Sequence, residues 1–273
     1  MNAATNSELP VGIFDSGVGG LTVLHAIREA MPAEHLVYLG DTARLPYGTK
    51  SPKSIERYAT QAAAKLREQG IKLLVVACNT ASAVALDVLR DQLAPMPVVG
   101  VVEPGAAAAV QGRLGGSHLV LATEATVGLG AYRDAILSLD ANADVTEQAC
   151  EMLVALAEEG WVDGPIARGI VRRYLDESHA VSPDTIILGC THFPLLADTI
   201  RDVASDRVQI VDSAGTTAAV VRATMDATGT RRESDDAGTL RLLATDGARR
   251  FARVGGRFLG HALSPEDVEL VDL

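Results

Sequence analysis

The 273-residue chain is poor in lysine, aromatic residues and cysteine. The shortage of lysine argues against partners that carry many negative charges. Its four lysines all lie between Lys50 and Lys72, and its formal net charge is −11 at pH 7. A surface that binds nucleic acid or an anionic membrane needs concentrated Lys and Arg. We therefore expect no nucleic-acid partner and no membrane partner.

Long apolar runs and cysteine clusters are also absent from the sequence. No run approaches the roughly 18–20 apolar residues of a membrane span. Residues 1–10 are polar and have neither the basic start nor the apolar core of a secretory signal peptide. Cys78, Cys150 and Cys190 are too widely spaced for a disulfide framework or a metal knuckle, and such usage fits a reducing compartment. We expect a cytoplasmic protein.

A ten-residue pattern is present twice, at residues 73–82 (LLVVACNTAS) and 185–194 (TIILGCTHFP). Each copy has a short aliphatic run, a small residue, a cysteine, two polar residues and then a segment that predicts a helix. Such a run is typical of a strand buried on both faces of a parallel sheet. Because open α/β sheets bind ligands outside the carboxyl ends of their strands, Cys78 and Cys190 are predicted to face a site between two half-molecules.

Strands alternate with helices along the chain, which predicts an α/β fold with mainly parallel sheets. Residues 14–27 and 122–136 share a strand, a polar turn and a helix, at an offset close to that between Cys78 and Cys190, so we expect two similar domains related by a pseudo-twofold axis. The first is predicted to comprise 1–97 plus 208–273 and the second 98–207, with the active site in the cleft between them. A terminal edge strand is expected at 268–271.

Two loops follow the first two predicted strands. The turn at residues 15–20 (DSGVGG) brings backbone amides and a helix N-terminus to one point, which favours a carboxylate or phosphate. The alternative is a tight strand-to-helix turn, and the spacing is not the dinucleotide-binding fingerprint. The loop at residues 41–48 (DTARLPYG) either lines a pocket or ends in a simple turn.

Two thiols on opposite faces of a carbon stereocentre suit its inversion, since one removes a proton while the other donates one. A cysteine at a helix N-terminus has a lowered pKa, which we expect for Cys78 and Cys190. Cys150 follows no apolar strand and is interpreted as structural. Asp15 is predicted to orient or deprotonate Cys78, and His192 to do the same for Cys190 if a non-helical turn lets their side chains meet.

Other chemistries are less consistent with these residues. A zinc site would use Cys78, Cys190 and His192. Pyridoxal phosphate needs a Schiff-base lysine, and no lysine has a site-like context. A cysteine hydrolase leaves one thiol unexplained, and a non-enzymatic binding protein needs neither thiol. We expect no metal and no cofactor.

The substrate contacts are predicted from the polar residues near the two cysteines. Ser16, Asn79, Thr80 and Thr191 are predicted to hold the carboxylate and ammonium groups of a zwitterion.

Together these motifs make the sequence resemble glutamate racemases, cofactor-independent enzymes that supply D-glutamate for bacterial peptidoglycan. The matching motifs lie at 12–20, 40–42, 46–48, 77–82, 189–195 and 211–214. The resemblance implies a homodimer with glutamate as substrate and Cys78 and Cys190 as the acid–base pair, partnered by Asp15 and His192. The substrate contacts that it implies are Asp15, Ser16, Tyr47, Gly48, Asn79, Thr80, Thr191 and His192.

Two acidic residues are expected to support this site, Asp41 and Glu158. Glu158 occupies the place of a family glutamate, although the two prolines and the phenylalanine that precede that glutamate are missing from residues 150–158. Aspartate racemases share the two-cysteine logic. The preference for glutamate over aspartate therefore rests on the resemblance alone.

Overall fold

The structure, a computed structural model, describes residues 6–180, 182–205 and 207–273. Residues 1–5, half of the polar N-terminal stretch considered above, lie outside the described residues. Among the described residues, no helix combines the length and the apolar character that crossing a membrane requires.

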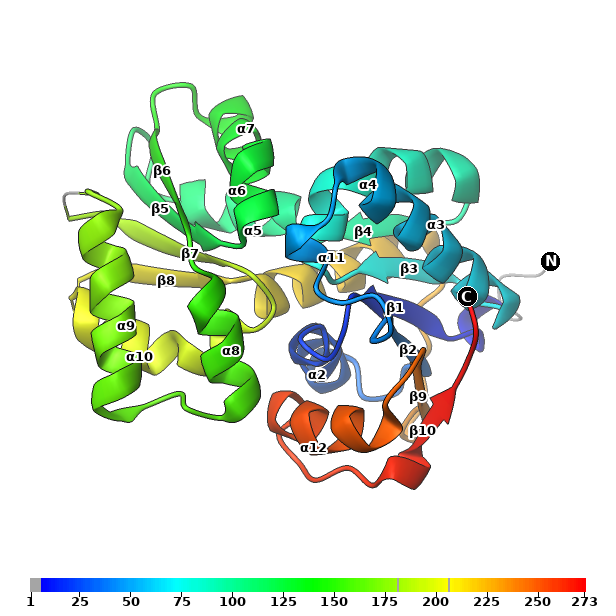
Figure 1. The fold of residues 1–273 in the computed structure, drawn as a ribbon. Coiled ribbons are helices and arrows are strands. Elements are labelled where there is room, and N and C mark those ends of the chain that lie inside the picture. The colour runs from blue at the N-terminus through cyan, green and yellow to red at the C-terminus, as the bar shows by residue number, and fades with distance from the viewer. Residues whose placement is uncertain (1–5, 181, 206) are drawn as a thin grey trace.

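The first sheet is parallel and has six strands in the order β10-β9-β2-β1-β3-β4 (Figure 1). Their bounds are β1 Val11–Asp15, β2 Leu36–Gly40, β3 Leu73–Val76, β4 Val98–Gly100, β9 Leu240–Ala244 and β10 Val268–Leu270. Helices cover both faces, which explains the uninterrupted aliphatic runs of the central strands. One face carries α2 (Leu21–Ala30), α11 (Ser213–Thr228) and α12 (Ala248–Leu259), and the other carries α3 (Pro52–Glu68) and α4 (Asn79–Leu93).

The second sheet is also parallel, with the order β6-β5-β7-β8. Its strands are β5 Ser117–Ala122, β6 Asp144–Ala149, β7 Thr185–Gly189 and β8 Gln209–Asp212. One face packs on α5 (Val102–Val110) and α7 (Ala131–Leu139), and the other on α8 (Glu151–Glu159), α9 (Gly164–Glu177) and α10 (Ala197–Ala204). The order repeats that of β2-β1-β3-β4, so the predicted α/β fold with two similar parallel sheets is confirmed.

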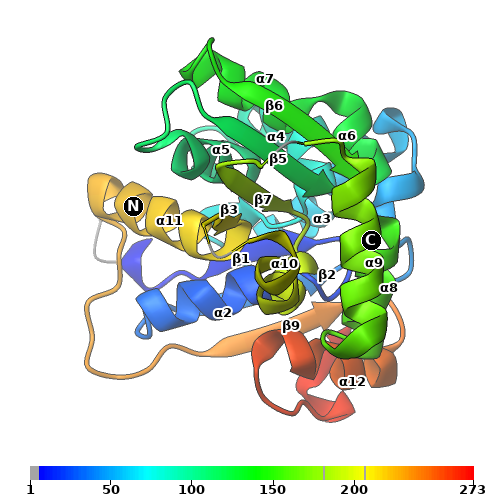
Figure 2. The same cartoon turned by 90° about the vertical axis from the view of Figure 1, so that its left-hand side faces the viewer.

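The chain passes between the sheets later than expected at both crossings. β4 pairs with β3 in the first sheet, and β8 pairs with β7 in the second. The boundaries at 97/98 and 207/208 separate each of these edge strands from its hydrogen-bonded neighbour. We propose instead a first lobe of residues 6–100 and 213–273 and a second lobe of 101–212. Helix α11 then runs back along α2 (Figure 2).

Several further elements differ from the predicted ones, and two of these differences have local causes. The helix expected to continue through Ile136 is broken at Gly130, whose φ of 64° separates α6 (Glu124–Leu129) from α7. Strand β6 was not predicted, because its sequence DVTEQA is polar and suits a half-exposed edge strand. Strand β9 and helix α12 were also missed. The predicted edge strand near the C-terminus, β10, is confirmed.

Candidate active site

Cys78 lies between β3 and α4, as the repeated pattern predicts. Its backbone is extended and its carbonyl accepts a hydrogen bond from the amide of Ser82 at 2.8 Å, which starts the helix. The side chain is nearly buried, and its thiol donates to Oγ of Ser16 at 3.6 Å. Ser16 follows β1, the neighbour of β3, so strand adjacency brings the glycine-rich turn and the first cysteine together.

The electrostatic setting of Cys78 differs from the expected one. Burial, and then the charge of the Asp15 carboxylate, raise the pKa of the Cys78 thiol to about 12. The amide of Ala81 and the hydroxyl of Ser16 oppose this rise but are outweighed. The expectation of a lowered pKa is therefore wrong for Cys78, because a helix N-terminus does not compensate for desolvation beside a carboxylate. Before substrate binds, Cys78 is a protonated thiol.

Asp15 ends β1 and is almost completely buried. Its Oδ2 accepts a hydrogen bond from the amide of Gly17 at 2.8 Å, whereas its Oδ1 has no partner within the described part of the chain. Burial raises the pKa of Asp15, and the nearby His192 lowers it. No hydrogen bond joins Asp15 to Cys78 among the described side chains. Asp15 thus acts on the thiol through its charge, and it keeps a free acceptor oxygen.

Cys190 and His192 form the second thiol site in a turn after β7. Nδ1 of His192 lies 3.8 Å from Sγ of Cys190, so the non-helical turn that this pairing requires is present. Nε2 of the same ring lies 3.2 Å from Oε1 of Glu158. Burial lowers the pKa of His192, but the hydrogen bonds with Cys190 and Glu158 and the charges of Cys190 and Asp15 raise it to about 10. The imidazolium therefore donates from both nitrogens.

Glu158, at the end of α8, completes this chain of hydrogen bonds. Its hydrogen bond from His192 lowers its pKa against the effect of burial, and the Arg250 charge lowers it further. Nη2 of Arg250 donates to the second carboxylate oxygen at 2.6 Å. The altered sequence before Glu158 has thus not removed the carboxylate from the neighbourhood of His192.

Asn79, the first residue of α4, is held by two residues that are distant from it in the sequence. Its Oδ1 accepts from the hydroxyl of Tyr132 at 2.7 Å and from Ser213 at 3.3 Å. Its Nδ2 is buried and has no partner among the described residues. A buried donor without a partner is costly unless a ligand accepts from it. Tyr132 was missed by the sequence analysis, because it lies on α7 with no polar motif around it.

The threonines expected at the site join the two lobes. The hydroxyls of Thr80, Thr123 and Thr126 form a triangle with sides of 3.1 Å, so Thr80 of the first lobe bonds two residues of the second. The carbonyl of Thr191 accepts from the hydroxyl of Thr22 at 3.2 Å. Both expected substrate residues therefore also hold the lobes together.

Asp41 anchors the loop that carries Tyr47 and Gly48. It is fully buried and accepts from Tyr47 at 2.5 Å, from Nε of Arg44 at 2.7 Å and from Thr245 at 3.0 Å. The hydroxyl of Tyr47 is therefore occupied by Asp41. The next residue, Gly48, stands against Thr123 of the second lobe, since a Cβ on Gly48 would lie 3.0 Å from Cβ of that threonine.

Cys150 occupies a junction like those of the other two cysteines. It follows β6, whose sequence is polar, and precedes α8, so it follows no apolar strand, as expected, although it does follow a strand. It is fully buried, its thiol donates to the carbonyl of Gln148 at 3.4 Å, and burial raises its pKa. That local bond is consistent with a structural role.

The other chemistries considered from the sequence have little support in this arrangement. Lys72 is buried and paired with Glu34 at 2.5 Å, at the end of β3 opposite to Cys78. Among the described residues, no group of three or more His, Cys, Asp or Glu side chains is placed to hold a metal ion.

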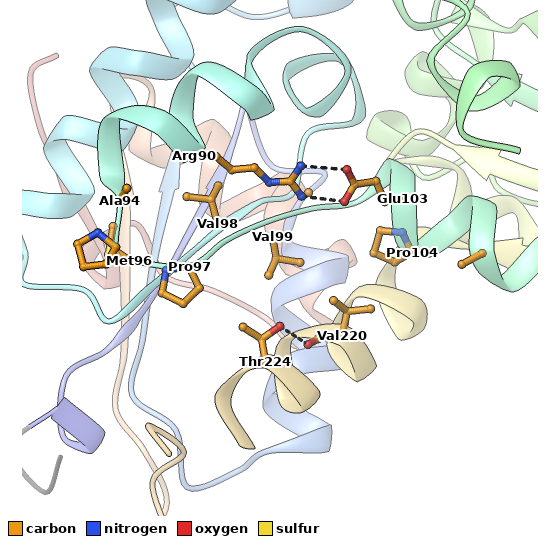
Figure 3. A pocket seen from close by; sticks show the side chains of 13 residues that line it. Arg90, Ala94, Met96, Pro97, Val98, Val99, Glu103, Pro104, Val220 and Thr224 are labelled. Atoms are coloured by element: carbon orange, nitrogen blue, oxygen red, sulfur yellow. Dashed lines mark hydrogen bonds and ion pairs between the residues drawn. The ribbon is translucent and has the colours of Figure 1, made fainter. Parts of the chain in front are cut away.

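A separate cavity of about 540 Å³ lies where the chain crosses between the lobes (Figure 3). The ion pair of Arg90 and Glu103 borders it, with Nη2 of Arg90 2.7 Å from Oε2 of Glu103. Val220 and Thr224 of α11 line its other side. None of the site residues described above lines this cavity.

Comparison with known proteins gives consistent results. The model of the Asp/Glu/hydantoin racemase family matches residues 12–223. The chain is 47% identical over 267 residues to the glutamate racemase of Geobacter metallireducens, covering 96% of each chain. It is similar in structure to glutamate racemase from Francisella tularensis in complex with D-glutamate, with a TM-score of 0.90, 32% identity and 97% and 98% of the two chains covered. For glutamate racemase from Thermus thermophilus in complex with beta-chloro-D-alanine, the TM-score is 0.88, with 40% identity and 98% of each chain covered.

Proposed function

This chain belongs to the Asp/Glu/hydantoin racemase family, and from that premise we propose that it is a glutamate racemase. It interconverts L- and D-glutamate by proton transfer between two cysteines, without a cofactor, and supplies D-glutamate for peptidoglycan synthesis. The observation that carries the proposal is the pair of nearly buried thiols, Cys78 from one lobe and Cys190 from the other. They are close enough that a charge on Cys190 raises the pKa of Cys78.

In this proposal each thiol serves one face of the α-carbon. The thiolate of one cysteine takes the α-proton, forming an S–H bond while the Cα–H electron pair passes into the substrate carboxylate. The thiol of the other cysteine then donates its proton to the opposite face of Cα and is left as the thiolate. Atoms and charge balance, and the two cysteines are left with exchanged protonation states. This state is ready for the opposite enantiomer, and proton exchange with solvent restores the starting state for the same one. His192 stabilises the thiolate of Cys190, because an imidazolium beside a thiolate favours the charged form.

The unpaired polar atoms of the site match the groups of an amino acid. We assign Nδ2 of Asn79 to the α-carboxylate, with Thr80, Thr191 and the Ser16 turn around it. We assign Oδ1 of Asp15 to the α-ammonium group. Since that ammonium would sit beside Asp15, it offsets the negative charge that raises the pKa of Cys78.

The distal carboxylate is assigned to the backbone at Tyr47 and Gly48, because the Tyr47 hydroxyl is occupied by Asp41. Asp41 and Glu158 then support the site indirectly, by holding the loop and the imidazolium of His192. This assignment makes the preference for glutamate over aspartate depend on how far the loop stands from Asn79.

A chiral assay of both amino acids without added cofactor tests the function. We expect interconversion of L- and D-glutamate, exchange of the α-hydrogen with solvent deuterium, and much slower reaction of aspartate. Cys78→Ala and Cys190→Ala should each lower racemisation by roughly 10²–10⁴-fold, the usual contribution of an acid–base group. Cys150→Ala is the matched control and should retain activity. Full activity in both site variants, or a preference for aspartate, would contradict the proposal.

We also propose that the protein is cytoplasmic and forms a homodimer. The mechanism requires reduced thiols, and the three cysteines are free, which suits a reducing compartment. The dimer rests on the family resemblance. Sedimentation at micromolar concentration tests it, and a single monomeric species would exclude it.

A further inference from the structure

Helix α12 belongs to the first lobe but reaches the second thiol site in the other lobe. In both views the end of α8 lies beside α12 (Figures 1 and 2). Arg250 donates to the carboxylate of Glu158 at 2.6 Å, and Arg257 donates to the backbone carbonyl of the same glutamate. The ring of Phe258 meets the His192 ring edge-on, with 5.0 Å between centroids and an interplanar angle of 76°.

These α12 residues share one face of the helix. Positions 250, 257 and 258 are separated by seven and eight residues, or about two turns, so their side chains project in one direction. The side chain of the adjacent Arg249 has no ion pair or hydrogen bond within the described part of the chain. The contact with Glu158 is therefore specific to one side of α12 and is not general to its arginines.

A chain of contacts connects the Cys190 thiol of the second lobe to Arg250 of the first lobe. Sγ of Cys190 lies 3.8 Å from His192, His192 lies 3.2 Å from Glu158, and Glu158 accepts from Arg250. Each carboxylate oxygen of Glu158 accepts from its own donor. Arg250 therefore fixes the orientation of the Glu158 carboxylate group, in which Oε1 faces the His192 imidazolium. Without Arg250, the carboxylate is free to rotate about its terminal torsion, which has only broad preferences.

We propose that Arg250 is a positioning residue for proton transfer at Cys190, acting through Glu158 and His192. This inference rests on the proposed racemase function. Because Arg250 comes from the first lobe and Glu158 from the second, the second thiol acquires its full set of partners only when the lobes are together. The contribution of Arg250 to folding is small, since its side chain is 55% exposed and exposed ion pairs add little stability.

Three variants test the proposal in the full-length enzyme: Arg250→Gln, Arg250→Lys and the matched control Arg249→Gln. We expect Arg250→Gln to lower kcat/KM by roughly tenfold, a fraction of a whole acid–base contribution, with an unchanged unfolding temperature. Arg250→Lys should recover most of the activity, because a single charged donor reaches Glu158. Arg249→Gln should match the parent enzyme.

The decisive measurement is the primary isotope effect with 2-deuterated L- and D-glutamate. If Arg250 acts on Cys190, the isotope effect on kcat/KM rises for the enantiomer whose proton Cys190 removes and does not rise for the other. Cys190→Ser identifies that enantiomer independently. Equal changes for both enantiomers, or an Arg250→Gln variant that matches Arg249→Gln, would overturn the inference. A parent enzyme without racemisation would instead refute the function itself, so the two failures are distinguishable.

Discussion

The backbone of Gly19 lies directly against the ring of His192, such that a Cβ on residue 19 would stand 2.5 Å from Nδ1. Gly19 belongs to the first lobe and His192 to the second. The glycine-rich turn is therefore a tight strand-to-helix turn that also forms part of the contact between lobes. Gly19 is required by its proximity to the second thiol site, whereas a Cβ on Gly20 would meet Asp15 within the turn itself.

Gly19→Ala should damage catalysis more than folding. The added methyl group collides with the Thr191 hydroxyl and the His192 ring, so both must shift, and misplacement of a catalytic group by about 1 Å is able to reduce the rate roughly a hundredfold. Overpacking of this kind costs roughly 1–3 kcal/mol of unfolding free energy. Steady-state racemisation and denaturant unfolding measure the two effects. Gly169→Ala is the control, because a Cβ on that exposed glycine of α9 meets nothing within 4 Å. Equal activity in the two variants would refute the contact.

Tyr132→Phe should lower kcat/KM for glutamate by roughly tenfold, equivalent to about 1.4 kcal/mol. The substitution removes the shorter of the two hydrogen bonds to Oδ1 of Asn79 and leaves the longer one from Ser213, so the amide is held less firmly and Nδ2 is directed less firmly toward the substrate. The net stability loss should be about 1 kcal/mol, as for one hydrogen bond. Chiral kinetics and thermal unfolding check both values.

Tyr174→Phe provides the comparison for Tyr132. The hydroxyl of Tyr174 accepts from the amide of Met152 at 3.2 Å on the second lobe, away from Asn79. The Tyr174→Phe variant should leave kcat/KM for glutamate unchanged. If Tyr132→Phe is equally silent, Asn79 does not depend on Tyr132 for its orientation.

The placement of the cysteines was predictable because it depends on short-range pattern. At both Cys78 and Cys190 a buried strand ends and a cysteine follows. An α-helix begins directly after Cys78, whereas Cys190 is followed by a turn and a short 3₁₀ helix at Phe193–Leu196, so the helix N-terminus expected at both cysteines is present only at Cys78. The parallel sheets and the meeting of Cys190 with His192 follow from the same local rules. Because the two sheets repeat the same strand order, the two halves of the chain share a sequence pattern that is detectable without the structure.

The partners of the site residues were not predictable in the same way. Tyr132 and Arg250 reach the site through tertiary packing, from helices outside the repeated cysteine pattern. One signal for α12 was present, since Phe251, Val254 and Phe258 recur at helical spacing between arginines. Two adjacent glycines inside that segment weaken the helix signal. The raised pKa of Cys78 depends on burial, which a linear pattern does not contain.

His118 should make the protein less stable in mild acid. This β5 residue is fully buried, and neither ring nitrogen has a partner among the described residues. Burial lowers its pKa despite the nearby Asp184 and Asp140. The unfolded chain therefore binds more protons than the folded protein as pH falls through about 6.5, and the unfolding free energy falls with it. Above that pH, this contribution disappears.

His118→Leu should remove that part of the pH dependence. Because it also removes a buried polar group without partners, it should raise the unfolding free energy at pH 5 by roughly 1–3 kcal/mol. Urea unfolding between pH 5 and 8 measures both effects. The exposed His261→Gln is the control and should keep the parent slope. A His118→Leu variant with the parent slope would mean that the ring keeps its ordinary pKa in the fold.

Asp15→Asn should make Cys78 more reactive while it slows racemisation. Burial and then the Asp15 charge raise the pKa of Cys78 to about 12, so the substrate-free protein holds very little thiolate near pH 8. The isosteric amide removes the charge but keeps the burial. Each unit by which the pKa of Cys78 falls should speed its alkylation by iodoacetamide roughly threefold, because the gain in thiolate, about tenfold, outweighs the lower nucleophilicity of a less basic thiolate. Mass spectrometry of the labelled peptides separates Cys78 from Cys150, whose rate serves as the internal control.

Racemisation by Asp15→Asn should fall at the same time, because the amide lacks the anionic oxygen assigned to the substrate ammonium. A Cys78 labelling rate equal to that of the parent protein would show that Asp15 is uncharged before substrate binds, and the electrostatic coupling between Asp15 and Cys78 would have to be abandoned.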